Sequence, residues 1–430
     1  MKSTRHDNRA GTSALRRLAT LTILAILLSL MAVPGAAAGL ANARAMGMAG
    51  AYVSLARGND CPSFNPANLG LDGGRRSGLQ IFGFGVSISN NSFSLDDYNH
   101  YTGATLNESD KDELLNKIPS EGLKVSADAE VTAVGLSMGN LAISLSAIGA
   151  AEINMGRTPM ELLLKGNAMA DTLDLEGMYG EGFGLASVNF SYGQRLYKNY
   201  DRQLAVGGTF RYLQGLGYEE VTELNGHAAT LATGYSGAGS LISRTATGGS
   251  GYAVDLGGAL KVSKSYTIGV TVFNLYSHVR WDRETKEHRY SFAFDTLTLA
   301  MMDGDSLVTS DDTTVAISPF TSQLPSLIRV GLARTAGRLL WAVDWEQGFK
   351  RGAGTSANPR VSAGCEFRLI GFLPLRAGMA VGGKAGTTYA AGLGLDFAGV
   401  YFDFGAANYN AVSAASGKGL TLGVQSGIRF

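Results

Sequence analysis

Residues 43–71 read ARAMGMAGAYVSLARGNDCPSFNPANLGL and combine very small side chains with two signals for helix formation. Ala43, Gly47, Gly50 and Ser54 recur at spacings of four and three, so on a helix they share one face. Two glycines in so short a helix cost about 1 kcal/mol each relative to alanine, so the helix needs a surface to pack against. We therefore expect a helix whose backbone lies close to a wall.

A second helical segment is expected to begin at Asn65-Pro66. Asn suits a helix cap, and Pro suits the first helical position, where the missing N–H has no partner to lose. A helix pair on a soluble domain would show the same local pattern. Only the rest of the sequence can distinguish a helix pair on a soluble domain from a plug that lies inside a barrel.

The run ARAMGMAGAYVSLA followed by NPANL resembles the N-terminal hatch of the FadL-type outer-membrane transporters and their PorV-like relatives, which carry an RxMGMGGA-like run and then an NPA turn. Cys61 departs from the family pattern, in which a small residue is expected. The resemblance implies that these residues plug the periplasmic end of a barrel. The hatch residues it identifies are Arg44, Met46, Gly47, Gly50, Asn65, Pro66 and Ala67.

The N-terminus has the pattern of a secretory signal peptide. Basic residues precede the apolar run 18–33, and Ala36-Ala37-Ala38 supplies small residues for cleavage before about Gly39. A membrane anchor is the alternative, but the run is short for a span and a cleavage-type sequence follows it. We therefore divide the chain into a signal peptide (1–38), a hatch (39–75) and an outer-membrane barrel (76–430).

The composition is rich in glycine and balanced in charge. The chain contains 58 Gly and 9 Pro, with 36 basic and 36 acidic residues, so neither nucleic acid nor an anionic membrane surface is favoured as a partner. After Gly39 no apolar run is long enough for a membrane-spanning helix. The two cysteines do not make a disulfide framework. An oxidised Cys61–Cys365 pair and two separate thiols both remain open.

The last strand shows the clearest alternation. Leu420, Leu422, Val424, Ile428 and Phe430 fall on one face, opposite Thr421, Gly423, Gln425, Gly427 and Arg429. A terminal Phe on the apolar face resembles the recognition signal that outer-membrane barrels present to their assembly machinery. We therefore expect Phe430 to act as a barrel-assembly signal and the apolar faces to contact outer-membrane lipid.

The same period of two predicts an all-β transmembrane antiparallel barrel with fourteen strands, the number that the FadL-type resemblance also implies. The predicted strands lie near 79–89, 125–138, 141–155, 176–196, 202–218, 250–262, 266–281, 325–335, 338–349, 359–369, 373–383, 388–397, 400–409 and 418–430. Tight turns alternate with longer links, as in outer-membrane barrels. The polar faces mix charges of both signs with small residues, which predicts a wet lumen, since unpaired buried charge costs several kcal/mol.

Three of the longer links contain signals of their own. Residues 109–119, SDKDELLNKIP, predict a short helix capped by Ser109 with Asp112, and 159–164 predict another. In the link 282–324 the run Tyr290, Phe292 and Phe294 alternates with polar residues. It predicts a hairpin above the membrane, with an additional strand pair in the barrel as the alternative.

No motif predicts a catalytic, metal or cofactor site, so we expect a protein that is not an enzyme. No two histidines have zinc spacing. Asp303-Gly304-Asp305 with Asp311-Asp312 lacks the calcium-loop pattern. His278 with Asn274 is the only pair to consider for a hydrolase, and no nucleophile is placed beside it.

Two functions fit this sequence. The first is a FadL-like passive transporter or carrier of hydrophobic small molecules in the outer membrane of a Gram-negative type cell. The second is a PorV-like barrel that transports nothing small and docks or shuttles secreted proteins, with secretion-system proteins as partners. Both share the hatch and the barrel, so the sequence does not separate them.

Overall fold

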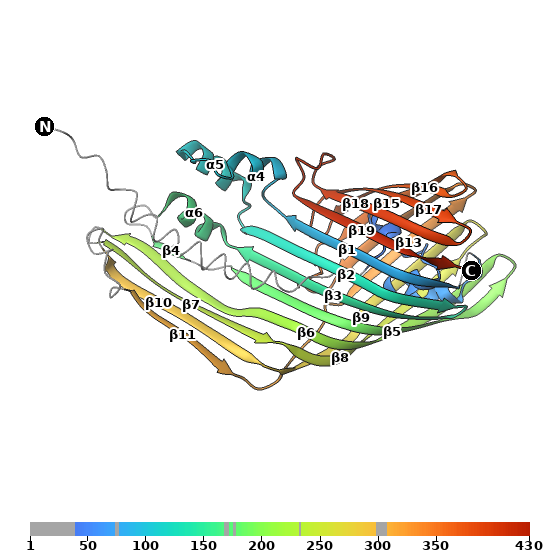
Figure 1. The fold of residues 1–430 in the computed structure, drawn as a ribbon, viewed down its shortest axis with the longest axis horizontal. Helices are drawn as coiled ribbons and strands as arrows, with labels where there is room; N and C mark the ends of the chain where they lie inside the picture. The colour runs from blue at the N-terminus through green and yellow to red at the C-terminus, as the bar shows by residue number, and fades with distance from the viewer. Residues whose placement is uncertain (1–38, 74–76, 167–171, 175–177, 232–233, 298–307) are drawn as a thin grey trace.

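The computed structural model describes residues 39–73, 77–166, 172–174, 178–231, 234–297 and 308–430, and they form a closed antiparallel barrel of fourteen strands (Figure 1). The barrel strands, in their order around the wall, are β1 (Gly78–Asn90), β2 (Leu123–Met138), β3 (Leu141–Met155), β5 (Tyr179–Asn199), β6 (Arg202–Leu231), β8 (Gly248–Lys261), β9 (Tyr266–Arg283), β13 (Leu327–Ala336), β14 (Leu339–Gly348), β15 (Arg360–Ile370), β16 (Leu373–Gly382), β17 (Thr388–Phe397), β18 (Val400–Tyr409) and β19 (Gly419–Arg429). The first and last strands pair from Gly78↔Arg429 to Ser89↔Gly419 and close the cylinder. Each predicted strand corresponds to one of these, so the fold class is confirmed.

All the tight turns lie at one end of the barrel, which we call the turn end. β2 and β3 are joined by residues 139–140, β13 and β14 by 337–338, and β17 and β18 by 398–399. The start of β1 and the end of β19 lie at this same end, because Gly78 pairs with Arg429. The longer links all lie at the opposite end, the loop end. In outer-membrane barrels short turns face the periplasm.

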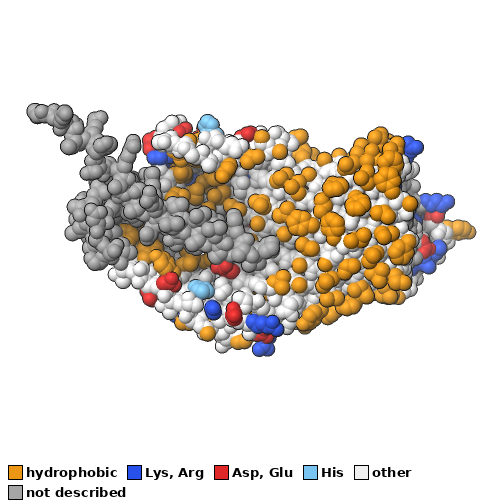
Figure 2. All heavy atoms as spheres, viewed as in Figure 1, with side chains coloured by type: hydrophobic (Ala, Val, Ile, Leu, Met, Phe, Trp, Pro, Cys, Tyr) orange, Lys and Arg blue, Asp and Glu red, His pale blue; other side chains and the backbone are white. Residues whose placement is uncertain are grey.

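The outer surface carries the apolar residues that the alternation predicted. Leu420 and Leu422 are 46% and 47% exposed, whereas Thr421 between them is 2% exposed. Figure 2 shows the apolar side chains gathered in a broad band over the strands, with charged side chains along its margins. Such a band, exposed in an isolated chain, is the surface that an outer-membrane barrel presents to lipid.

Additional strands extend the wall beyond the barrel at the loop end: β4 (Thr172–Asp174), β7 (Gly234–Ala246), β10 (Lys286–Leu297), β11 (Val308–Ala316) and β12 (Phe320–Ser322). β6 is 30 residues long, and β7, β10 and β11 pair beside its outer half. The link after residue 218 is therefore largely strand, which the sequence prediction missed. The expected hairpin is present as β10 and β11, and it is also joined edge to edge to β7.

Short helices stand on the loop end: α4 (Leu95–Tyr101), α5 (Glu108–Lys117) and α6 (Arg157–Lys165). The predicted helix at 109–119 is confirmed as α5, but the predicted cap was wrong. Asn107 and Asp110 form the capping box, because the Asn107 side chain accepts the N–H of Asp110 and the Asp110 carboxylate accepts the N–H of Asn107. In the described part of the chain, no helix combines the length and the apolar character needed to cross a membrane.

Two of the sequence expectations lie outside the described residues. They are the signal peptide, residues 1–38, and the Asp303-Gly304-Asp305 run.

Candidate functional site

Residues 39–73, called the hatch below, lie inside the barrel at the turn end (Figure 1). The hatch contains α2 (Ala43–Met46), η1 (Gly58–Asp60), α3 (Cys61–Phe64) and η2 (Pro66–Gly70). The first of these packs on β17, β18 and β19, and the last packs on β5, β6 and β8. The hatch therefore reaches across the lumen from one side of the wall to the other.

The predicted small-residue helix was wrong in its length. It ends at Met46 after a single turn, because Ala49 and Gly50 adopt left-handed backbone conformations with φ of 52° and 84°. Four residues that would have shared one helix face instead meet different strands. The hydroxyl of Ser54, for example, donates to the carbonyl of Gly331 on β13 over 2.7 Å.

The part of the barrel wall that lies against the small hatch residues consists mainly of glycines. Inward-facing glycines on neighbouring strands lie opposite or near one another around the barrel. We call this set the glycine belt; it comprises Gly85, Gly423, Gly405, Gly392, Gly378, Gly364, Gly331, Gly269, Gly257, Gly207 and Gly193. The belt lines most of the wall around the hatch at one level of the lumen, although β2, β3 and β14 contribute no glycine to it. Residues without a side chain leave the hatch backbone room to lie against the strands.

The hatch backbone rests directly on this belt. A Cβ atom at Gly378 would lie 2.3 Å from the carbonyl carbon of Met48, and one at Gly207 would lie 2.5 Å from that of Pro66. From the other side, a Cβ at Gly47 would lie 2.8 Å from the Cα of Gly392. Neither the wall nor the hatch can accept a side chain at these positions without moving backbone.

The second helical segment begins where the sequence predicts, as a 3-10 turn. The Asn65 side chain accepts the N–H of Ala67 over 3.0 Å and donates to the carbonyl of Gly258 on β8 over 3.0 Å. Pro66 lies over Gly193 and Gly207. The Asn65 side chain thus starts the turn and also attaches it to the barrel.

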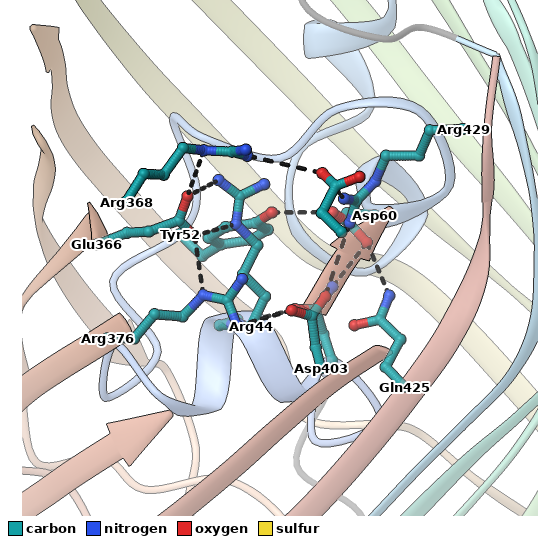
Figure 3. Close-up of polar contacts among 12 residues, drawn as sticks. Arg44, Tyr52, Asp60, Glu366, Arg368, Arg376, Asp403, Gln425 and Arg429 are labelled. Atoms are coloured by element: carbon teal, nitrogen blue, oxygen red, sulfur yellow. Dashed lines mark hydrogen bonds and ion pairs between the residues drawn. The ribbon is translucent and has the colours of Figure 1, made fainter. Parts of the chain in front are cut away.

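A network of charged side chains joins the hatch to β15, β16, β18 and β19 (Figure 3). Arg44 donates through Nε and Nη2 to both oxygens of Glu366, at 2.7 and 3.0 Å. The guanidinium of Arg376 shares the same carboxylate at 2.8 Å and reaches Asp403 at 2.7 Å. Glu366 and Arg376 are 2% and 6% exposed, so the network is buried and its charges are compensated within it. Met46, two residues beyond Arg44, packs its methyl group against Gly423.

Tyr52 extends the hatch contacts to β14, the strand that pairs with β15. Its backbone N–H and that of Val53 donate to one oxygen of Asp344 on β14, at 2.6 and 2.8 Å. Its hydroxyl donates to Asp60 over 2.9 Å (Figure 3). Burial raises the pKa of the Tyr52 hydroxyl well above its ordinary value, so the group remains a neutral donor.

Several inward charges at the level of the hatch are therefore buried and held by ion pairs or hydrogen bonds, and an open lumen does not solvate them. Asp255 is 1% exposed and bonds Arg211 and the N–H of Asn274, and Asp344 is 4% exposed and bonds the hatch. The expectation of a wet lumen was wrong at this level. The mixture of signs that suggested water reflects carboxylates whose partners come from other strands and from the hatch.

A second set of contacts closes the lumen at the loop end. Arg351, in the link between β14 and β15, donates to Glu152 on β3 over 3.2 Å, and Lys384, between β16 and β17, lies 2.6 Å from the same carboxylate. The N–H of Ala353 donates to Glu181 on β5 over 3.1 Å. We call these five residues the mouth cluster. They tie two loops to the wall on the other side of the barrel.

Beside the mouth cluster, one side of the inner wall is apolar. Buried side chains from β3, β5, β6, β7, β8, β9, the link before β13 and Ala353 of the mouth cluster pack together there, with Tyr218 and Trp281 ring centroids 5.1 Å apart. This apolar lumen cluster includes Phe183, Leu185, Leu213, Tyr218, Val279, Trp281 and Leu324. Sequence reasoning missed it, because its members lie on separate strands. Nearer the hatch the wall carries buried polar side chains such as Ser187, Asn189 and Thr209.

The other predicted site residues have these positions. Among the described residues Cys61 and Cys365 are both thiols with no disulfide between them. Phe430 is 68% exposed on the outer face, and its N–H donates to the carbonyl of Ser77. The structure does not bring His278 and Asn274 together: His278 lies beside Tyr252, whereas the Asn274 amide donates to the carbonyl of Pro325. No cluster of metal-binding side chains occurs in the described ranges.

Comparison with known proteins identifies the fold. A family of unknown function, DUF5723, matches residues 75–240, and no curated protein matches the chain. The Ralstonia pickettii toluene transporter TbuX has a TM-score of 0.51 and 14% identity over 92% of this chain and 99% of its own. The Pseudomonas putida toluene transporter TodX has a TM-score of 0.51 and 11% identity over the same shares.

The monoaromatic hydrocarbon channel CymD is similar to the same degree, with a TM-score of 0.50 and 12% identity over 92% of this chain and 98% of its own. At these identities the likeness establishes architecture and not chemistry. The chain has the fold of the FadL and TodX type of outer-membrane channel, a fourteen-stranded β-barrel.

Proposed function

We propose that this protein is a passive outer-membrane conduit or carrier for hydrophobic small molecules. In this proposal residues 1–38 form a signal peptide that is removed on export, residues 39–75 form the hatch, and residues 76–430 form the barrel. The turn end then faces the periplasm and the loop end faces the outside.

The observation that carries the proposal is the apolar lumen cluster beside the mouth cluster. A water-filled porin has a polar interior, whereas here Phe183, Leu213 and Trp281 face inward and are at most 6% exposed. A barrel of fourteen strands encloses more space than its own side chains fill in an eight-stranded barrel, which leaves room for a hatch and a ligand. A hydrophobic molecule that enters would exchange contacts with this cluster.

Passage in this proposal is controlled at both ends. A molecule from outside first passes the mouth cluster, then contacts the apolar lumen cluster, and leaves when the hatch moves from the glycine belt. The side chains described supply no means of coupling movement to an energy source, so passage follows the concentration gradient. The paired charges around the hatch present no single-sign field that would select small ions.

Binding can be tested with the tryptophans of the chain, which are Trp281, Trp341 and Trp345. Trp281 lies in the apolar lumen cluster, whereas Trp345 is 39% exposed on the outer face. A variant with W341F and W345F leaves Trp281 as the single reporter. Toluene or a long-chain fatty acid should then change its fluorescence saturably, and a matched variant with W281F should show no saturable change.

Transport is tested by uptake of the same labelled compounds, in cells with and without the protein and in liposomes that contain the purified barrel. Faster uptake with the protein supports the conduit. Equal uptake with and without the protein, together with no saturable change in Trp281 fluorescence, would reject the conduit. A stable complex with a secreted protein, in that case, would support the PorV-like docking function.

Phe430 belongs to the proposal as a barrel-assembly signal. Its exposed ring continues the outer apolar face of β19 beside Ile428. Deletion of Phe430 should reduce the amount of folded barrel in the outer membrane, whereas Phe430→Tyr, which keeps the aromatic ring, should restore it. Equal assembly of all three chains would reject this role.

A further inference from the structure

The first described residue of the hatch lies against a buried carboxylate. The backbone nitrogen of Gly39 donates to Oε2 of Glu130 over 2.6 Å, and that of Ala41 donates to the same oxygen over 3.3 Å. Glu130 is on β2, faces the lumen and is 4% exposed. The hatch thus begins at an acidic group inside the barrel.

Glu130, like Asp344, accepts hydrogen bonds from hatch backbone N–H groups, and in this it differs from the ion-paired carboxylates Glu366 and Asp255. Glu366 is shared by Arg44 and Arg376, and Asp255 is paired with Arg211. Within the described residues Glu130 forms no ion pair, and its hydrogen bonds come from backbone N–H groups at the start of the hatch. A buried carboxylate without a cation is costly, so a positive charge at this place would be stabilising.

We propose that the peptide bond between Ala38 and Gly39 is where the export signal is removed, and that the new Gly39 ammonium forms a buried ion pair with Glu130. A leader peptidase would add water across this bond, so that Ala38 gains a carboxylate and the Gly39 nitrogen becomes an ammonium. That nitrogen is already 2.6 Å from Glu130, so no rearrangement of the hatch is required. The inference rests on the predicted signal peptide and not on the transport function.

The surroundings of Gly39 agree with this position for the mature terminus. Ala36 and Ala38 are small residues at the two positions before the bond that a leader peptidase requires. A Cβ atom on Gly39 would lie 2.7 Å from the ring of Phe64, so the site fits a glycine. Gly39 itself is buried inside the barrel, beside Glu130.

The ion pair also attaches the hatch at its very start. It would act with Arg44–Glu366 and with the Asp344 contacts to hold three successive points of the hatch on β2, β15 and β14. The charge on the terminus would strengthen this attachment beyond the hydrogen bond alone.

The first test is the mass of the full-length gene product purified from the outer membrane of a Gram-negative host. The expected mature chain begins at Gly39. A chain that begins at Asn42, for which Gly39 and Ala41 would be the small residues, or one that retains residues before Gly39, would overturn the proposal.

The second test measures the reactivity of the terminal amine. The folded protein is pulsed with an acetylating reagent at several pH values, and the terminal peptide is quantified by mass spectrometry against the free peptide GLANAR. An ordinary α-amine has a pKa of about 7.7–8.0. At pH 8 the Gly39 amine should react at least tenfold more slowly than the peptide, with a reactivity midpoint at higher pH.

Variants of Glu130 distinguish the effect of its charge on the reactivity of the Gly39 amine from the effect of burial alone. Glu130→Gln keeps an acceptor oxygen and removes the charge, so the reactivity midpoint should return toward the peptide value; Glu130→Asp should be intermediate. Asp72→Asn, at the other end of the hatch, is the matched control and should leave Gly39 protected. An identical midpoint in wild type and Glu130→Gln would reject the ion pair. If Glu130→Gln fails to assemble, an ordinary midpoint in the wild type alone would also reject it.

Discussion

The two ends of the lumen are closed by different kinds of contact. At the turn end, hatch backbone lies on the glycine belt, and the Arg44–Glu366 pair is buried, with the Glu366 side chain 3% exposed. At the loop end, two loops reach across the lumen, and the Arg351 side chain that ties one of them is 48% exposed. One closure is a packed core, and in the other partly solvated cations from two loops meet a buried carboxylate on the wall, Glu152.

This difference predicts an order of opening. Partners of a buried ion pair cannot separate cheaply, because each would be left as an uncompensated charge in a poorly solvated place. A solvated pair exchanges its partner for water at little cost. We expect the loop end to open more often than the turn end and the hatch to set the rate of passage.

The largest effect is expected from Glu366→Ala. It leaves the guanidinium groups of Arg44 and Arg376 without their shared carboxylate, and breaking a buried pair costs about 3–5 kcal/mol. The free energy of unfolding in denaturant should fall by that amount, and trypsin should cut the hatch at Arg44 or Arg57. Glu287→Ala, which breaks the more exposed pair with Arg289, is the control and should change little. If both variants behave alike, the turn end is not the stronger closure.

A smaller loss is expected from Gly47→Leu, because the new side chain overlaps the backbone of Gly392. Overpacking a tight contact costs about 1–3 kcal/mol. The hatch should become sensitive to protease, and uptake of labelled hydrophobic compounds should rise. Gly371→Leu, at a tight turn where nothing lies within 4 Å of the added Cβ, is the matched control. If the hatch of Gly47→Leu remained as resistant to protease as that of the wild type, the hatch would not be packed closely against the glycine belt.

Arg351→Ala tests the loop end. Glu152 is buried but keeps Lys384 as its partner, and the Arg351 side chain is half exposed, so we expect a loss of only about 1 kcal/mol and little change in global stability. The link 349–359 should nevertheless become more sensitive to trypsin at Lys350, while the hatch stays protected. Release of the hatch by this variant would contradict the separation of the two closures.

The smallest effect concerns pH at the point where the hatch leaves the lumen. The Lys198 hydrogen bond, and then that of Arg195, hold the pKa of Asp72 below its usual value, so folding favours the carboxylate form. Its contribution is fully present above the unfolded pKa of about 4 and is lost as pH falls through the folded value. Unfolding measured from pH 6 to pH 3 should therefore show a slightly weaker acid dependence in Asp72→Asn than in wild type. If the free energy of unfolding depended on pH in the same way in both proteins, the Asp72 carboxylate would not help to attach the hatch.

Much of the barrel could be predicted because its signals are local. A period of two, as in Leu420, Leu422 and Val424, states which side chains share a face, and short turns alternate with long links along the chain. The start of the second hatch segment was predictable for the same reason, since Asn65 caps a turn two residues away. The 234–246 strand was missed because Gly, Ser and Ala there give no alternation, and only pairing with β6 and β10 makes it a strand.

By itself, the sequence determined the strand faces, the strand number and the existence of a separate small-residue segment before the barrel. The tertiary structure alone decided how that segment folds and what holds it. Gly47 and Gly50 were assigned to a helix because helix periodicity is local, yet their conformation follows from wall glycines and from Arg360, which lies over Gly50. Arg44 and Glu366 are separated by 322 residues, and their pairing arises only when barrel closure brings β15 beside the hatch.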